Sequence, residues 1–341
     1  MKNLSAIIIL WVVLLLLGCQ HKKSHPKTSH QDTTSVYIQK ALSNKTPYAL
    51  RVQYTQKAVE GLALEQNDSV NRHKFIQLCR NFNDLNKWED LKKTSKIFLL
   101  KSQEAHDEYF IGHSYRWLGV YYENESMNDS AFYYYLKAEK IFKNYNDKEI
   151  LAKLYLDKSS VQINVFDIHG AEKSIITSLK YSKLINDKMS QYDAFLNLAI
   201  ASTQSDDYDK AIYYIKKALL IAKNNPQFDK FFIKEIALNN LGYYHSFKNN
   251  HIKAIAIYKA ALLNKNLRKK LPRIYSTIEG NLAYSYFVIN PNNSTSFFLF
   301  LDAIKIADSL NRRSKVVFFK NHLSEYYCYK RDTLTALKLA K

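Results

Sequence analysis

Hydrophobic and polar residues follow one another along most of this chain with the period of an α-helix, in a unit that recurs seven times. In each unit a small residue lies near the end of one helical stretch, a polar turn follows, and a second amphipathic stretch opens around an alanine. The unit is clearest from Asn128 (NDSAFYYYLKAEKIF) and from Asp206 (DDYDKAIYYIKKALLIA). In such turns an Asp side chain caps the helix that follows. The pattern therefore predicts a succession of helix pairs.

The opening position of the second stretch recurs at nearly constant spacing. It is occupied by Leu91, Ala131, Ala171, Ala211, Ala254, Ser296 and Ala336. The intervals that begin at Ala211 and at Ala254 are slightly longer than the others. A period between about 20 and 50 residues is the signature of a solenoid, in which each repeat buries its apolar face against its neighbours. The expected fold is all-α, a right-handed superhelical solenoid of about seven repeats over residues 36–341, with the last repeat incomplete.

The residues from Gly112 to Lys143 carry a family pattern. The first stretch has Tyr115, Leu118, Gly119 and Tyr122, and the second has Ala131, Tyr135 and Ala138. This unit resembles the tetratricopeptide repeat (TPR), in which small residues let helix A and helix B approach closely. The period of about 40 is longer than that family's usual 34. The resemblance implies a protein that displays a binding surface.

Some copies depart from the pattern. Lys158 replaces the expected Leu before Ser159, and Leu91 replaces the alanine that opens the second stretch of an early unit. Upstream, Tyr48 to Leu64 is predicted to be an amphipathic helix of a further, diverged pair.

The N-terminus has the features of a secretory signal. Lys2 precedes an apolar run from Ala6 to Leu17, which is too short to span a membrane as a helix. The run ends in Leu16-Leu17-Gly18-Cys19, which resembles a bacterial lipobox. That resemblance implies a signal peptide over 1–18 and lipidation of Cys19, whereas the alternative is an ordinary signal peptide with a chance cysteine. Residues 19–35 are expected to be a flexible basic tether, and Gln20 favours the outer membrane, periplasmic side, by analogy with lipoprotein sorting.

The charge of the chain changes this picture little. The net charge is +19, but lysine supplies most of it and is spread along most helices. The densest clusters are Lys265 to Arg273 and Arg312 to Lys315, both in expected inter-repeat loops. Since a secreted lipoprotein would not meet DNA, no nucleic-acid partner is expected. Cys79 and Cys328 lie many repeats apart, so we expect two buried thiols rather than a disulfide.

No catalytic arrangement is apparent in the sequence. It contains no HExxH, CxxC, GxSxG or glycine-rich phosphate loop. His21, His25 and His30 are interpreted as solvated tether residues rather than metal ligands. We therefore expect no enzyme activity, no cofactor and no metal site.

A partner-binding groove is expected on helix A, because in the TPR family certain positions of that helix point into a concave face. Counting back from each small residue gives these candidates: Arg80, Asn83, Arg116, Asn124, Asn164, Asn239, Tyr243, Tyr284, Asn321 and Tyr329. Asn can donate to and accept from a peptide backbone, Arg can hold a carboxylate, and Tyr offers a rigid contact area. Taken singly, each has the alternative of an ordinary solvated or packing residue.

Two functions are compatible with this pattern. The first is a lipid-anchored, periplasm-facing scaffold that binds a protein or peptide. The second is the sensor arm of a truncated envelope regulator, which would lack a transmembrane helix and a helix-turn-helix or histidine-kinase module. With no capping helix after Ala340, Phe318, Phe319, Leu323, Leu334 and Leu337 are expected to be partly exposed. The partner and the oligomeric state stay open.

Overall fold

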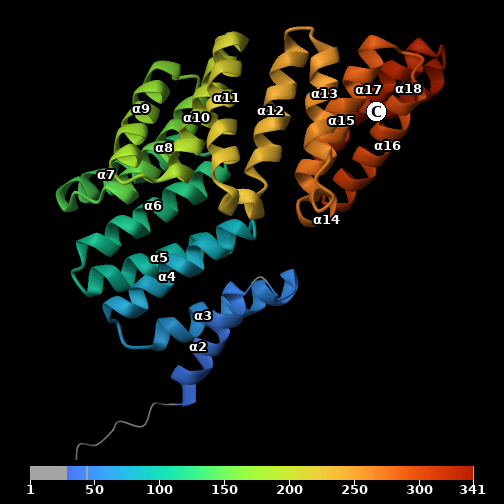
Figure 1. Ribbon diagram of the computed structural model, residues 1–341. Coiled ribbons are helices and arrows are strands. Elements are labelled where there is room, and N and C mark those ends of the chain that lie inside the picture. The colour runs from blue at the N-terminus through green and yellow to red at the C-terminus, as the bar shows by residue number, and fades with distance from the viewer. Residues whose placement is uncertain (1–28, 44, 341) are drawn as a thin grey trace, which may run out of the picture. The chain divides into compact units, whose positions relative to one another are not determined.

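The computed structural model describes residues 29–43 and 45–340, and all regular elements in these residues are helices (Figure 1). The predicted all-α fold of helix–turn–helix repeats is confirmed. The chain divides into two compact units, Met1–Glu125 and Ser126–Lys341. The expected signal peptide, Cys19 and most of the expected tether lie outside the described residues.

The first unit holds α2 (Ser29–Leu42), α3 (Tyr48–Leu64), α4 (Ser69–Asp84), α5 (Trp88–Glu104) and α6 (Glu108–Asn124). The second unit begins with α7 (Asn128–Tyr145), α8 (Lys148–Asn164), α9 (Ile168–Leu184), α10 (Lys188–Gln204) and α11 (Tyr208–Asn224). It continues through η1 (Pro226–Phe231), α12 (Ile233–Phe247), α13 (His251–Leu262), α14 (Leu267–Lys270), α15 (Pro272–Ile289), α16 (Ser294–Ser309), α17 (Arg313–Tyr329) and α18 (Thr333–Ala340).

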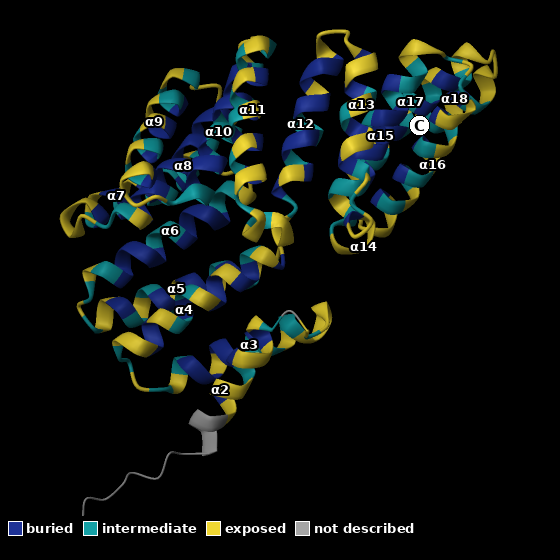
Figure 2. Ribbon diagram, in the orientation of Figure 1, coloured by how far each residue is buried: buried dark blue, intermediate teal, exposed yellow. Residues whose placement is uncertain are grey.

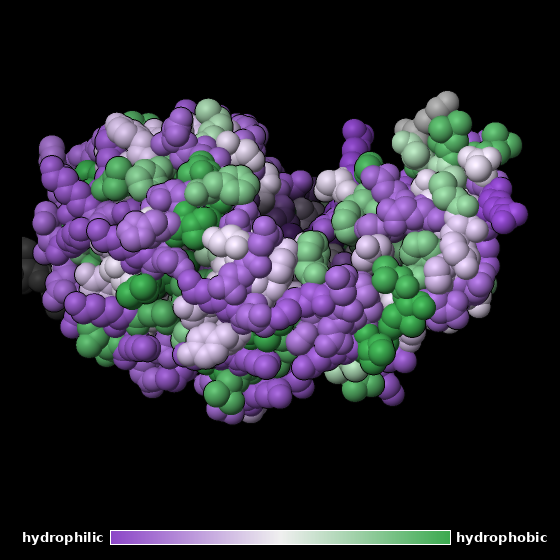
Figure 3. Space-filling view, turned by 90° about the horizontal axis from the view of Figure 1, so that it is seen from above, coloured by the Kyte–Doolittle hydropathy of each residue, from purple (hydrophilic) through white to green (hydrophobic). Residues whose placement is uncertain are grey.

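The sequence repeat corresponds to these helices one for one. We call α4, α6, α8, α10, α12, α15 and α17 the A helices, and we call α5, α7, α9, α11, α13, α16 and α18 the B helices. Each of the seven recurring positions lies in the first turn of a B helix, and its side chain is buried in every case. Burial forms a stripe along most helices and covers much of α10 and α12 (Figure 2). On the face seen in Figure 3, hydrophilic residues predominate and hydrophobic side chains are scattered among them.

The upstream pair is α2 and α3. Helix α3 has the predicted bounds, and the Tyr37 and Tyr54 rings stack between the two helices at 5.9 Å. Helix α2 begins at Ser29, inside the segment 19–35 that was expected to be a tether. The physical reason is that Thr34 is buried against α3 beside Gly61. The helical part of the chain therefore starts earlier than residue 36.

The turns between helices explain the period of the repeat. At the end of α10, the Asp206 and Asp207 amides donate to the Thr203 and Ser202 carbonyl oxygens, at 3.2 and 3.0 Å. This is the Schellman arrangement, in which one residue adopts a left-handed backbone. The Asp207 carboxylate then accepts from the Lys210 amide at 2.9 Å and caps α11. One short turn thus ends a helix and starts the next.

Left-handed residues mark these turns along the chain. They are Asn86, His106, Ser126, Asn146, Phe166, Asn186, Asp206, Phe232, Asn249, Asn311 and Arg331, and none is glycine. The first seven recur at constant spacing, because most half-repeats combine a helix of one length with a turn of one length. The two longer intervals of the repeat, from Ala211 to Ala254 and from there to Ser296, contain η1 and α14 respectively.

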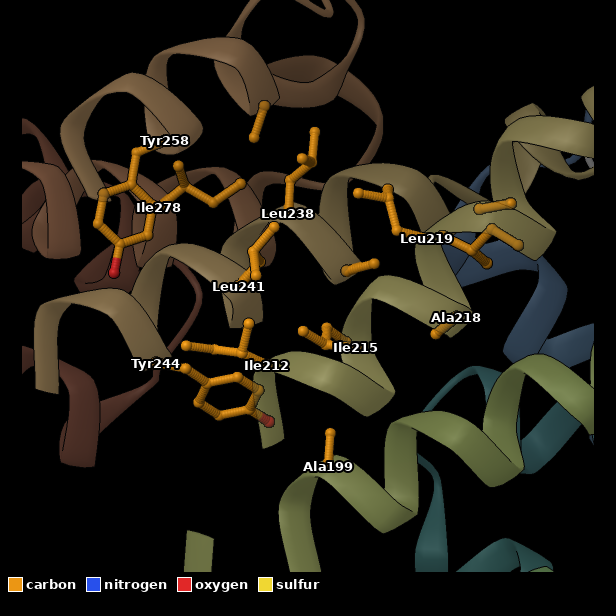
Figure 4. Close-up of a cluster of buried hydrophobic side chains, with 14 of the residues drawn as sticks. Ala199, Ile212, Ile215, Ala218, Leu219, Leu238, Leu241, Tyr244, Tyr258 and Ile278 are labelled. Atoms are coloured by element: carbon orange, nitrogen blue, oxygen red, sulfur yellow. The ribbon is translucent and has the colours of Figure 1, made fainter. Parts of the chain in front are cut away.

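Close approach of helices depends on the small residues of the A helices. A Cβ atom built on Gly242 of α12 would lie 2.5 Å from Cε1 of Tyr258 on α13, so no larger residue fits without displacing that ring. Around this contact, Leu219, Leu238 and Ile278 fill the space between α11, α12 and α15 (Figure 4). The core is therefore continuous across the repeats of α11, α12 and α15.

One departure from the repeat is compensated by a buried ion pair. Lys158 of α8, at the position where the family pattern has Leu, is 8% exposed and pairs with Glu139 of α7. Tyr155 Oη also donates to Glu139 at 2.7 Å, and Lys143 Nζ lies 2.7 Å from it. Burial opposes ionisation of Glu139, but the hydrogen bonds from Lys143, Lys158 and Tyr155 outweigh it and lower the pKa of Glu139 to about 2.

The expectations for three residues need correction. Cys79 is buried as expected, but Cys328 is exposed, because it lies on the side of α17 that faces away from its neighbours. In the last repeat, Phe318, Leu334 and Leu337 are exposed as expected. Phe319 and Leu323 are instead buried, since they pack against α15 and α16.

Lys158→Met is expected to lower the free energy of unfolding by about 3 kcal/mol, because it leaves the Glu139 carboxylate buried beside fewer partners. The double variant Glu139→Gln/Lys158→Met is expected to recover at least half of that loss, since Gln still accepts from Tyr155. Urea denaturation at pH 7 measures both. Because the pKa of Glu139 is lowered in the fold, the ion pair contributes above the ordinary pKa of Glu and is lost as the pH falls from about 5 towards 2.

Lys153→Met is the matched control, because Lys153 makes an exposed pair with Glu149 on the same helix. It should change stability by less than about 0.5 kcal/mol. Equal losses in the Lys153 and Lys158 variants would contradict the structural role of the buried pair.

Phe166→Gly is expected to stabilise the second unit by about 1 kcal/mol, since a left-handed backbone costs a residue with a Cβ atom roughly that amount. Phe166 has a φ of 61° and is 70% exposed, so little packing is lost. Thermal unfolding followed by circular dichroism measures the change. Phe166→Ala keeps the Cβ atom, and a gain as large as that of the Gly variant would show that backbone relief is not the cause.

Candidate functional site

The A helices of neighbouring repeats lie against one another in the second unit. Helix α8 contacts α10, α12 contacts α15, and α15 contacts α17. Between α10 and α12, the Tyr192 hydroxyl donates to the Ile233 carbonyl oxygen at 2.8 Å. Each B helix instead packs against the A helix of the next repeat, as α11 does on α12 and α13 does on α15. The solvent-facing sides of the A helices therefore form a surface that continues from repeat to repeat. We use the name helix A surface for Asn197, Asn239, Asn240, Tyr243, Asn281, Tyr284 and His322.

Side-chain amides link the A helices along this surface. Asn281 Nδ2 of α15 donates to Asn239 Oδ1 of α12 at 3.1 Å, and Asn239 Nδ2 donates to Asn240 Oδ1 at 3.3 Å. On α10, Asn197 Nδ2 donates to Ser159 Oγ of α8 at 3.1 Å. These amides are half-buried. An amide group has two N–H donors and an oxygen with two lone pairs, so each Asn keeps capacity for another partner.

Aromatic rings lie at the α15 and α17 end of the helix A surface. The ring of Tyr284 on α15 lies 4.4 Å from that of His322 on α17, and His322 lies 4.6 Å from Phe318. Burial, with a smaller contribution from the charge of Glu325, raises the pKa of Tyr284. On α12, Tyr243 lies 4.6 Å from Phe247. These rings offer rigid apolar area beside hydrogen-bonding groups.

Carboxylates lie at the other end, on α8 and α10. Asp193 is one turn from Asn197, and burial, together with the negative charges of Asp187 and Asp157, raises the pKa of Asp193 to about 7. A cation bound here would offset that repulsion. This end of the surface therefore favours positive charge, although the chain as a whole is basic.

The predicted residues of the first unit lie on α4 and α6. Arg80 is exposed and Asn83 is half-buried. The guanidinium of Arg116 lies 5.2 Å from the ring of Trp117, and Asn124 Nδ2 donates to the Val120 carbonyl of its own helix at 2.8 Å.

The predicted residues of the second unit fall into two groups. Asn239, Tyr243 and Tyr284 belong to the helix A surface. Asn164 and Asn321 are exposed, and Tyr329 is exposed with its ring 6.5 Å from that of Phe287.

Sequence reasoning missed Asn197, Asn240, Asn281 and His322. A signal was present, because Asn197, Asn239 and Asn281 recur at equal intervals in the sequence. Counting fixed family positions back from each small residue overlooked this recurrence. His322 has no such signal, since its place beside Tyr284 depends on how α15 and α17 pack.

Comparison with known proteins identifies the fold of this chain but assigns it to no family. No family model matches the chain, and no curated protein matches it either. Solved structures of TPR-like helical repeats do match.

Three of these structures were solved as complexes. A Rap protein complexed with competence and sporulation factor has a TM-score of 0.61 at 13% identity, covering 91% of this chain and 95% of that chain. The Rap conjugation gene regulator of plasmid pLS20, in complex with the Phr* peptide, has a TM-score of 0.59 at 13% identity, with 91% and 82% covered. NprR in complex with its cognate peptide NprX has a TM-score of 0.57 at 16% identity, with 91% and 88% covered. At these identities the likeness shows the fold alone.

One observation concerns membrane-spanning helices. None of the helices in the described part of the chain combines the length and the apolar character needed to cross a bilayer.

Proposed function

We propose that this protein is a scaffold that binds an extended peptide segment, either free or part of a protein, along its helix A surface. The observation that carries the proposal is the recurrence of half-buried asparagine amides on α10, α12 and α15, with hydrogen bonds that join α10 to α8 and α15 to α12. Amides in such a row suit a backbone that presents N–H and C=O groups at regular intervals.

The dimensions agree with such a ligand. Packed helices are about 8–10 Å apart, and an extended chain rises about 3.3 Å per residue. One A helix therefore meets roughly every third residue of the ligand. Because the amides would bind backbone groups, which all peptides share, the preference for particular side chains would come from the two ends of the surface. Asp157 and Asp193 favour a cationic residue, whereas Tyr284, His322 and Phe318 favour an apolar or aromatic one.

The similar structures support this proposal as precedents. NprR and the pLS20 Rap regulator were each solved with a peptide, so a fold of this kind accommodates one. The proposal includes no catalytic role and calls for neither a cofactor nor a metal.

The location of the scaffold rests on its sequence. The apolar run that ends in Leu16-Leu17-Gly18-Cys19 supports lipidation at Cys19 and attachment to the envelope membrane, on the periplasmic side of the outer membrane by the sorting analogy at Gln20. The solenoid would then meet peptides and proteins of the envelope rather than nucleic acid.

Asn239→Ala/Asn281→Ala is expected to weaken peptide binding at least tenfold, because each substitution removes a backbone-binding amide worth about 1 kcal/mol or more. Peptides are first selected from a random display library on the wild-type chain, and the affinities of synthetic copies are then measured by isothermal titration calorimetry. Asn164→Ala is the control, since it removes an exposed Asn that lies off this surface. The proposal fails if the selected peptides bind the double variant as tightly as they bind the control.

Cys19→Ala is expected to move the protein from the membrane fraction to the soluble fraction of cells, since the acylated sulfur would be missing. Immunoblotting of fractionated cells measures this, with Cys328→Ala as the control for loss of a cysteine. An unchanged membrane band in the Cys19 variant would contradict the anchor while leaving the peptide-binding proposal intact.

A further inference from the structure

The two densest basic clusters of the sequence come together in the second unit. Arg312, the residue before α17, reaches back to the start of α15, where its Nη1 donates to the Arg273 carbonyl oxygen at 3.0 Å. The same atom lies 3.4 Å from Thr277 Oγ1. Residues far apart in the chain therefore share one corner of adjacent repeats. Arg313 and Lys315 follow in the first turn of α17.

These side chains have no acidic neighbour to balance them. Among residues 29–43 and 45–340, no carboxylate lies within ion-pair distance of Arg273, Arg312, Arg313 or Lys315. Arg268 differs, because Asp302 accepts from it at 2.7 and 2.9 Å and neutralises it. Burial and the charge of Arg273 lower the pKa of Arg312, and burial and the charge of Arg312 lower the pKa of Lys315. Arg312 therefore lies near both Arg273 and Lys315, and the Arg312 and Lys315 side chains are partly buried.

The backbone at this corner adds to the positive potential. Helices α15 and α17 both start here, and neither start has a side-chain cap. The A helices α4, α6, α8 and α10 are instead capped by Asp68, Asp107, Asp147 and Asp187. A helix N-terminus carries a partial positive charge and unpaired N–H groups, so basic residues there repel it weakly and a bound anion would offset that repulsion.

We propose that Arg273, Arg312 and Lys315 form a binding site for a phosphate group at the corner where α15 and α17 begin. A compact anion with several acceptor oxygens can accept from guanidinium groups, an ammonium group and helix-terminal N–H groups at once. The group belongs either to a lipid headgroup or to a soluble phosphate compound. The site borders the aromatic end of the helix A surface, because Lys315 Nζ lies 5.1 Å from the ring of Phe318. Phosphate binding is therefore measured in the absence of peptide.

Arg273→Gln/Lys315→Gln tests the site without removing the Arg312 hydrogen bond, because that bond uses the backbone carbonyl of residue 273. Binding of inorganic phosphate to the full chain is measured by isothermal titration calorimetry at low ionic strength. The wild-type chain should bind one phosphate, and the double variant should bind it at least tenfold more weakly. Lys180→Gln/Lys183→Gln removes two charges from exposed positions of α9 and should bind as the wild type does.

Three results would overturn the proposal: no binding to the wild type, equal binding to the double variant, or equal weakening in the α9 control, which would indicate attraction by net charge alone. Circular dichroism of each variant checks that it is folded. Flotation with phosphatidylglycerol and phosphatidylcholine vesicles then identifies the source of the phosphate. A preference for phosphatidylglycerol that the double variant loses points to a lipid headgroup. Phosphate binding without that preference points to a soluble compound.

Discussion

The structure depends on one local constraint, the short turn that ends one helix and caps the next. In that turn a left-handed residue lets two backbone amides bond to the preceding helix, and an Asp or Asn side chain then accepts from the helix that follows. Where this turn joins helices of equal length, as in α9, α10 and α11, the half-repeats have the same length. Between α13 and α15 the short helix α14 replaces it, and Asn281 of α15 still donates to Asn239 of α12.

Since each repeat contacts only its neighbours, a departure from the pattern can be corrected locally. Lys158 shows this most clearly, because the carboxylate that balances it comes from the adjacent helix α7. The inserted elements η1 and α14 behave in the same way, since they lengthen the period without interrupting the core around Tyr258 and Ile278. The solenoid tolerates a substitution or insertion in one repeat because its stability comes from contacts spread over all repeats.

The sequence was sufficient to predict the helices, their pairing and the buried repeat positions, because these follow from local periodicity. It predicted Asn239, Tyr243 and Tyr284 from family positions, but it missed Asn197 and Asn281, whose spacing differs slightly from that of most repeats. His322 could not be predicted, because its neighbours come from another repeat. The exposure of Cys328 was missed for a similar reason, since which side of α17 faces its neighbours depends on how the helices pack.

The hydrogen bond between Asn239 and Asn281 has a consequence for how such a surface distinguishes its ligands. The amides of α10, α12 and α15 lie on successive A helices about 10 Å apart, and that distance corresponds to about three residues of an extended chain. Under the proposed function, a segment too short to reach from the carboxylates of α8 and α10 to the rings of α15 and α17 would lose the contacts at one end. The surface would then select its ligands by length as well as by composition.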